Sequence, residues 1–156
     1  MARGARGMWT AGVTAVVLLL AGCPDKVAAK AFNSCQWGKK HFQELDHAAA
    51  QREFDNALEA KPNYTGARIG RALVHDSYSR YEEAIAELNL AAQRSPKSPQ
   101  VLQTRACMHE HAGNATQAQE DEDAAKALAP DMKPEHRCDK RWMFDLKFDF
   151  CQVKGE

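Results

Sequence analysis

The stretch TGARIGRALVHDSYSRYEEAIAELNLAAQRSPKS, residues 65–98, decides the fold, because its pattern recurs on both sides at the same length. A spacing of 34 residues separates its proline from those of the two neighbouring units: Pro62, Pro96 and Pro130. In the blocks that begin at Ala31, Thr65 and Pro99, four more columns agree: a small residue at place 8, His at place 11, and Ala at places 20 and 27. A constant period of this length predicts stacked helical units.

Each block is expected to form two helices. The predicted ranges are about 31–44, 47–60, 65–77, 81–94, 99–112 and 115–128. Small residues at places 8 and 20 allow the two helices of a unit to cross closely, and the proline ends the second one. This pattern is similar to the tetratricopeptide repeat. The resemblance implies an all-α, right-handed solenoid of about three repeats, at 31–64, 65–98 and 99–132, with a capping segment at 133–156.

Two charged pairs lie at equivalent places of the second and third units. Arg71 precedes Glu87, and Arg105 precedes Asp121, each by sixteen residues. We expect each pair to bridge the two helices of its unit; the alternative is two separately solvated charges.

The N-terminal segment differs from the repeats. Arg3 and Arg6 precede an apolar run at residues 9–20, which is too short for a membrane span of about 20 residues and suits a signal peptide at 1–22. The run ends in Leu-Ala-Gly-Cys at residues 20–23, which resembles the lipobox of bacterial lipoproteins. The resemblance implies lipidation of Cys23, a short tether at 23–30, and a place in the cell envelope, facing the periplasm and at the outer membrane. A signal anchor is the alternative reading.

The resemblance also implies a groove lined by the first helices of the repeats. It places in that groove Lys39, Phe42, Ile69, Leu73, Asp76, Gln103 and Glu110. A protein or peptide partner is therefore expected. Nucleic acid is not expected, because 21 basic side chains balance 21 acidic ones.

The C-terminal segment predicts a cap. Pro134 can begin a helix that runs through 141, whose basic side chains could face the acidic run at 120–123. From Trp142 to Phe150, apolar residues alternate with others, which fits either a strand or a helix with aromatics on two sides; helix is slightly preferred.

Four cysteines besides Cys23 allow three disulfide connectivities in an oxidising compartment. Possible bridges involve Cys107, Cys138 and Cys151. A bond between Cys138 and Cys151 would exclude a continuous terminal helix, and a bond between Cys107 and Cys138 joins neighbouring helices. We expect Cys35, at the opposite end, to remain free or to pack as a small residue.

No catalytic motif is present, and no cofactor or metal is expected. The repeated histidines, His41, His75 and His109, are expected to be packed rings. The function predicted is therefore a membrane-anchored adaptor. The alternatives are a metal- or redox-responsive protein that uses the histidines and cysteines, such as His109 and His111 with Cys107, and a structural subunit whose groove holds its own tail.

Overall fold

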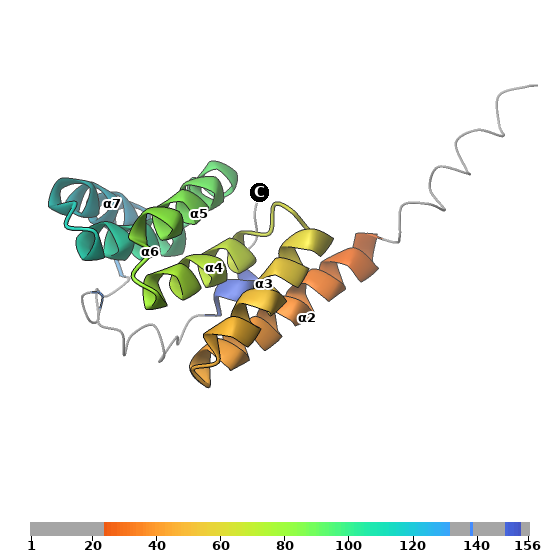
Figure 1. The fold of residues 1–156 in the computed structure, drawn as a ribbon. Helices are drawn as coiled ribbons and strands as arrows, with labels where there is room; N and C mark the ends of the chain where they lie inside the picture. Colours follow the sequence, from red (N-terminus) through yellow and green to blue (C-terminus); the bar gives the residue numbers. More distant parts are fainter. Residues whose placement is uncertain (1–23, 132–137, 139–148, 154–156) are drawn as a thin grey trace, which may run out of the picture.

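The computed structural model describes residues 24–131, 138 and 149–153. Within these ranges the chain is all-α, with six α-helices and one 3-10 turn (Figure 1). They are α2 (Pro24–Gln43), α3 (His47–Ala60), α4 (Thr65–Ser77), α5 (Tyr81–Arg94), α6 (Pro99–His111), α7 (Ala115–Leu128) and η1 (Phe150–Gln152). Among the described helices, none has the length and apolar character that a membrane crossing requires.

The predicted helices are confirmed to within a residue at nearly every end, apart from the start of the first. Helix α2 begins at Pro24 instead of near residue 31, so residues expected to form a tether belong to the helix. The physical reason lies in the composition of this stretch. Pro24 suits the first position of a helix, and the alanines and lysines that follow are strong helix formers.

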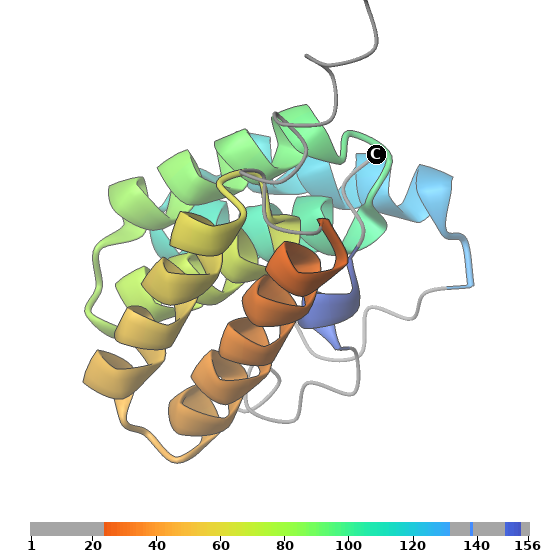
Figure 2. The ribbon, with the colours of Figure 1, turned by 90° about the vertical axis from the view of Figure 1, so that its right-hand side faces the viewer.

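The helices stack as three antiparallel pairs, α2 with α3, α4 with α5, and α6 with α7 (Figure 2). Each second helix also packs on the first helix of the next pair, and α4 contacts both α2 and α6. The first helices α2, α4 and α6 therefore share one side of the array, here called the first-helix face. This is the arrangement that the repeat predicts.

Small residues make the close crossings possible. A Cβ added at Gly38 would lie 2.6 Å from the Phe54 ring, and one at Gly70 would lie closer still to the same ring. Phe54 of α3 is fully buried and thus fills the space between α2 and α4. The repeated alanines at places 20 and 27 are also buried: Ala50, Ala84, Ala118, Ala57, Ala91 and Ala125.

The turns repeat as regularly as the helices. The second helix of each unit ends two residues before the unit's proline, at Ala60, Arg94 and Leu128. Between the helices of each unit, the residue at place 15 has a left-handed backbone: φ is 64° at Leu45, 59° at Ser79 and 80° at Gly113. All three units therefore reverse direction by the same local geometry.

The predicted charged pairs are confirmed. Arg71 lies 3.0 Å from Glu87, and Arg105 lies 2.6 Å from Asp121. Each arginine also reaches back to the preceding repeat, Arg71 to Asp55 at 3.3 Å and Arg105 to Asn89 at 2.9 Å. The same side chain thus connects the two helices of its own repeat and links successive repeats.

Candidate functional site

Of the predicted groove residues in the first two repeats, Phe42, Ile69, Leu73 and Asp76 are buried and Lys39 is partly exposed. Phe42, Ile69 and Leu73 are each 1% exposed, and they belong to the same core cluster as Phe150 and Cys151 of the C-terminal segment. In the third repeat, Gln103 is partly exposed and Glu110 is exposed. In this conformation the apolar half of the predicted groove is therefore closed, and its polar half is accessible.

The chain's own residues 149–153 occupy the first-helix face, where η1 packs on α2 and α4 (Figure 2). Asp149 accepts a hydrogen bond of 2.6 Å from Gln36 and lies 3.4 Å from the Lys39 ammonium. A Cβ added at Gly66 would lie 2.5 Å from the carbonyl oxygen of Phe150, so only glycine allows this approach. In the sequence, the signal that could have indicated this contact is a glycine, Gly66, at a groove-facing place of the repeat.

Phe150 anchors the segment. Its side chain is fully buried, its ring centroid lies 6.0 Å from that of Phe54, and the Lys39 ammonium lies 5.7 Å from its centroid. The Tyr64 hydroxyl donates to the carbonyl oxygen of Cys151. Burial, and secondarily the negative charge of Asp149, raises the pKa of Tyr64 to about 12, so the hydroxyl stays protonated as a donor. The aromatic tail was predicted to be buried against the solenoid. Its residues Phe150 and Cys151 are buried there, against the first two repeats.

Two disulfides join the C-terminal part of the chain to the helices. Cys107 is bonded to Cys138, with Cα atoms 5.1 Å apart, as expected for neighbouring segments. Cys35 is bonded to Cys151, with Cα atoms 5.8 Å apart. The expectation that Cys35 stays free was wrong, because the tail does not remain at the third repeat but returns to the first.

The C-terminal segment also departs from the predicted helix at Cys138. This residue forms a bend with a φ of 34°, so a continuous helix from 134 to 141 is wrong at that point. The other residues of that range, and residues 142–148, lie outside the described residues. Cys23 and the predicted signal peptide lie outside them as well.

His111 connects the tail to two helices of the array. Its Nδ1 lies 2.6 Å from Oδ1 of Asp76 on α4, and its Nε2 lies 3.1 Å from the carbonyl oxygen of Cys138. The hydrogen bond to the buried Asp76 carboxylate raises the pKa of His111, against the opposing effect of burial. The imidazolium form can donate to both acceptors at once.

The repeated histidines occupy equivalent sites inside the array. His75 is 9% exposed, and His41 and His109 are partly buried. Burial lowers the pKa of both His75 and His109, which favours neutral rings. Over the described ranges, no group of three or more potential ligands could hold a metal ion, and the sulfur of Cys107 is already bonded to Cys138.

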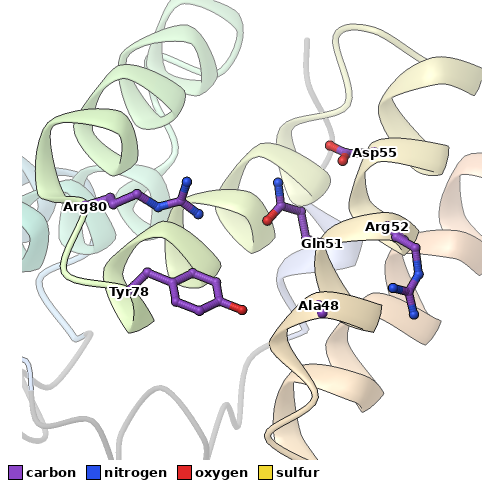
Figure 3. Close-up of a pocket in the computed structure, with 6 residues that line it drawn as sticks. All are labelled: Ala48, Gln51, Arg52, Asp55, Tyr78 and Arg80. Atoms are coloured by element: carbon purple, nitrogen blue, oxygen red, sulfur yellow. The ribbon is translucent and has the colours of Figure 1, made fainter.

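A second surface lies between α3 and the corner that joins α4 to α5 (Figure 3). It is an open depression of about 460 Å³. Its lining consists of Ala48, Gln51, Arg52, Asp55, Tyr78 and Arg80. None of these residues stands out in the sequence, because none belongs to the first-helix places on which the repeat's groove is built.

Comparisons with known proteins agree with this architecture. A sequence model described as tetratricopeptide repeat matches residues 41–106. No curated protein matches the chain. Among solved structures, a mutant of MamA is similar in fold, with a TM-score of 0.56 and 24% sequence identity, covering 70% of this chain and 77% of that one. Together with the three equivalent helix pairs, these matches show an all-α repeat fold with tetratricopeptide repeats over residues 41–106.

Proposed function

We propose that this chain is a lipid-anchored adaptor of the bacterial cell envelope, which holds a protein partner next to a membrane. The coarser part of this statement follows from the repeats, because tetratricopeptide arrays act as protein-interaction scaffolds. The finer part, the anchor and the compartment, rests on the lipobox-like sequence at residues 20–23.

The observation that carries the proposed compartment is the pair of disulfides. Cys35–Cys151 and Cys107–Cys138 join segments that are distant in sequence, with separations of 116 and 31 residues. Such bonds persist in oxidising compartments and are rare in a reducing cytosol. They therefore support export independently of the N-terminal sequence.

The anchor can be tested by replacing Cys23 with serine in the full chain. We expect the unaltered chain to be recovered with the outer-membrane fraction, with fatty acyl groups on its N-terminal peptide in mass spectrometry. The Cys23→Ser variant should lose both the acyl groups and the membrane association, because several acyl chains are needed for stable anchoring. A variant with serine at Cys107 and Cys138 is the matched control and should keep both. Recovery of unacylated wild-type chain in a soluble fraction would contradict the proposal.

The adaptor role can be tested by crosslinking in native membranes. We expect a protein to be captured reproducibly by the wild-type chain and lost when the Cys23→Ser variant leaves the membrane. A chain that crosslinks to no protein in intact membranes would contradict an adaptor role.

A second candidate is a structural subunit whose groove is filled permanently by its own tail. The complete burial of Phe150 against Phe54 favours this reading of the first-helix face. Deletion of residues 142–156 separates two roles of the tail. If the shortened chain stays helical and gains a surface that binds apolar probes, the tail is a groove filler; if it unfolds, the tail is part of the core.

A further inference from the structure

The depression between α3 and the α4–α5 corner brings three polar side chains together. Gln51 points from α3 toward the corner, and Tyr78 and Arg80 point from the corner into the same space (Figure 3). Arg52 also lines the depression, but its guanidinium points away from this space (Figure 3). The amide, the hydroxyl and the guanidinium can each donate hydrogen bonds to an acceptor that enters this space.

The backbone and the neighbouring rings hold these donors in place. Ser79, between Tyr78 and Arg80, has a φ of 59°, and the Arg80 amide donates to the His75 carbonyl at 2.9 Å. The Tyr78 ring lies 5.9 Å from the His47 ring and 5.1 Å from the Arg80 guanidinium carbon. Tyr78 and Arg80 are therefore positioned before any ligand arrives, which lowers the ordering cost of binding.

Arg80 carries a charge that the described part of the chain does not neutralise. Its Nε is buried and has no hydrogen-bond partner among the described residues, and no described carboxylate forms an ion pair with it. The carboxylate on the opposite wall, Asp55, is instead 3.3 Å from Arg71. Because Arg80 lines the depression, a carboxylate supplied from outside can pair with the terminal nitrogens of its guanidinium.

The positive charge at this corner also affects its surroundings. Burial is the first cause of the lowered pKa of His75, and the charges of Arg80 and Arg71 lower it further, against the smaller opposing effects of Glu87 and Glu83. At His75 the two arginine charges thus outweigh the two glutamate charges.

We propose that this depression binds a glutamate or aspartate side chain presented by a protein partner. Arg80 donates to the carboxylate, with Tyr78 and Gln51 as additional donors. The partner's neighbouring apolar groups cover the Tyr78 side, because Tyr78 is 49% exposed. The depression is open, whereas sites for small free ligands bury roughly 70–90% of the ligand's surface. An open site of this kind suits a side chain carried by a larger surface. This inference deepens the proposed adaptor function and rests on it.

The test is a titration of the folded, disulfide-bonded chain, followed through the arginine Nε–Hε signals in a two-dimensional NMR spectrum. The probe is the peptide acetyl-Ala-Glu-Leu-Ala-amide, and its isostere with Gln in place of Glu is the uncharged control. We expect the Arg80 signal to shift saturably with the Glu peptide and at least about tenfold more weakly with the Gln peptide, because a charge-assisted hydrogen bond is lost. The signal of Arg94, outside the depression, should not saturate.

Two variants sharpen the assignment. Arg80→Gln should weaken binding of the Glu peptide by roughly tenfold or more, whereas Arg94→Gln, outside the depression, should leave the affinity unchanged. If Arg80→Gln does not fold, the wild-type titration alone still decides. Equal responses to the Glu and Gln peptides would overturn the inference. Tighter binding of inorganic phosphate than of the Glu peptide would also overturn the inference, because the site would then bind free anions. Membrane recovery through Cys23 does not depend on Arg80, so either result leaves the anchor test intact.

Discussion

Replacing both Cys35 and Cys151 with alanine should destabilise the protein more than removing the Cys107–Cys138 bond does. The bond between them closes a separation of 116 residues, whereas Cys107–Cys138 closes 31. The chain-entropy relation gives about 4.8 kcal/mol for the longer separation and about 3.7 kcal/mol for the shorter one. Because the shorter loop lies inside the longer one, the separation with the inner bond intact is 116 minus 31, or 85 residues, for which the relation gives about 4.6 kcal/mol.

The assay is urea unfolding under oxidising conditions, followed by far-ultraviolet circular dichroism. The variant with alanine at Cys107 and Cys138 is the matched control, since both double substitutions leave one native bond in place. We expect the Cys35/Cys151 variant to be about 1 kcal/mol less stable than this control. Equal or reversed losses would refute the view that the tail stabilises the array mainly by closing a long loop.

Three further predictions concern the described contacts. Because the carboxylate partner raises the pKa of His111, the stabilising contribution of His111 is fully present below the ordinary value of 6.5 and is lost as the pH rises through the higher folded value. His111→Asn should therefore flatten the fall in urea stability as the pH rises above 6.5. Arg105→Ala leaves the Asp121 carboxylate, 9% exposed, without its charged partner and should lower the free energy of unfolding by about 1–3 kcal/mol in thermal or urea unfolding. Lys126→Ala, at an exposed pair, should lower it by less than about 0.5 kcal/mol. Equal losses in the two variants would contradict the importance of burial. Gly66→Ala places a Cβ 2.5 Å from a tail carbonyl oxygen and should increase the free thiols counted after refolding in a glutathione buffer; an unchanged count would show that the tail tolerates the side chain.

The repeat array could be predicted almost entirely from the sequence. Helix crossings can be recognised in the sequence, because a small residue must recur at each place where two helix backbones approach closely. Gly38, Ala72 and Ala106 are such residues. The charged pairs were predictable for the same reason, since equivalent places in a repeat meet equivalent neighbours. The early start of α2 escaped prediction because Pro24 to Lys30 precede the first repeating block and have no counterpart in the others.

The position of the tail was not predictable in this way. Asp149 and Gln36 are 113 residues apart, and Asp149 belongs to no repeating column. Alternating aromatics indicated that the segment must be buried, but they did not indicate where. In the sequence, Gly66 alone indicated where the tail packs. A single glycine in a helix can equally serve helix packing or a nearby helix end. The depression around Arg80 was missed for a related reason, since unpaired charge becomes evident only when the neighbours are known.

The bond between Cys35 and Cys151 has a mechanical consequence. If the chain is pulled by its two ends, the tension passes from residue 35 directly to residue 151 through the sulfur atoms. Residues 36–150, which include the rest of α2 and the helices α3 to α7, lie outside this load path. Solenoids normally unravel repeat by repeat under force because each unit contacts only its neighbours. Here the helices between the two cysteines would carry tensile force only after the Cys35–Cys151 disulfide had been broken.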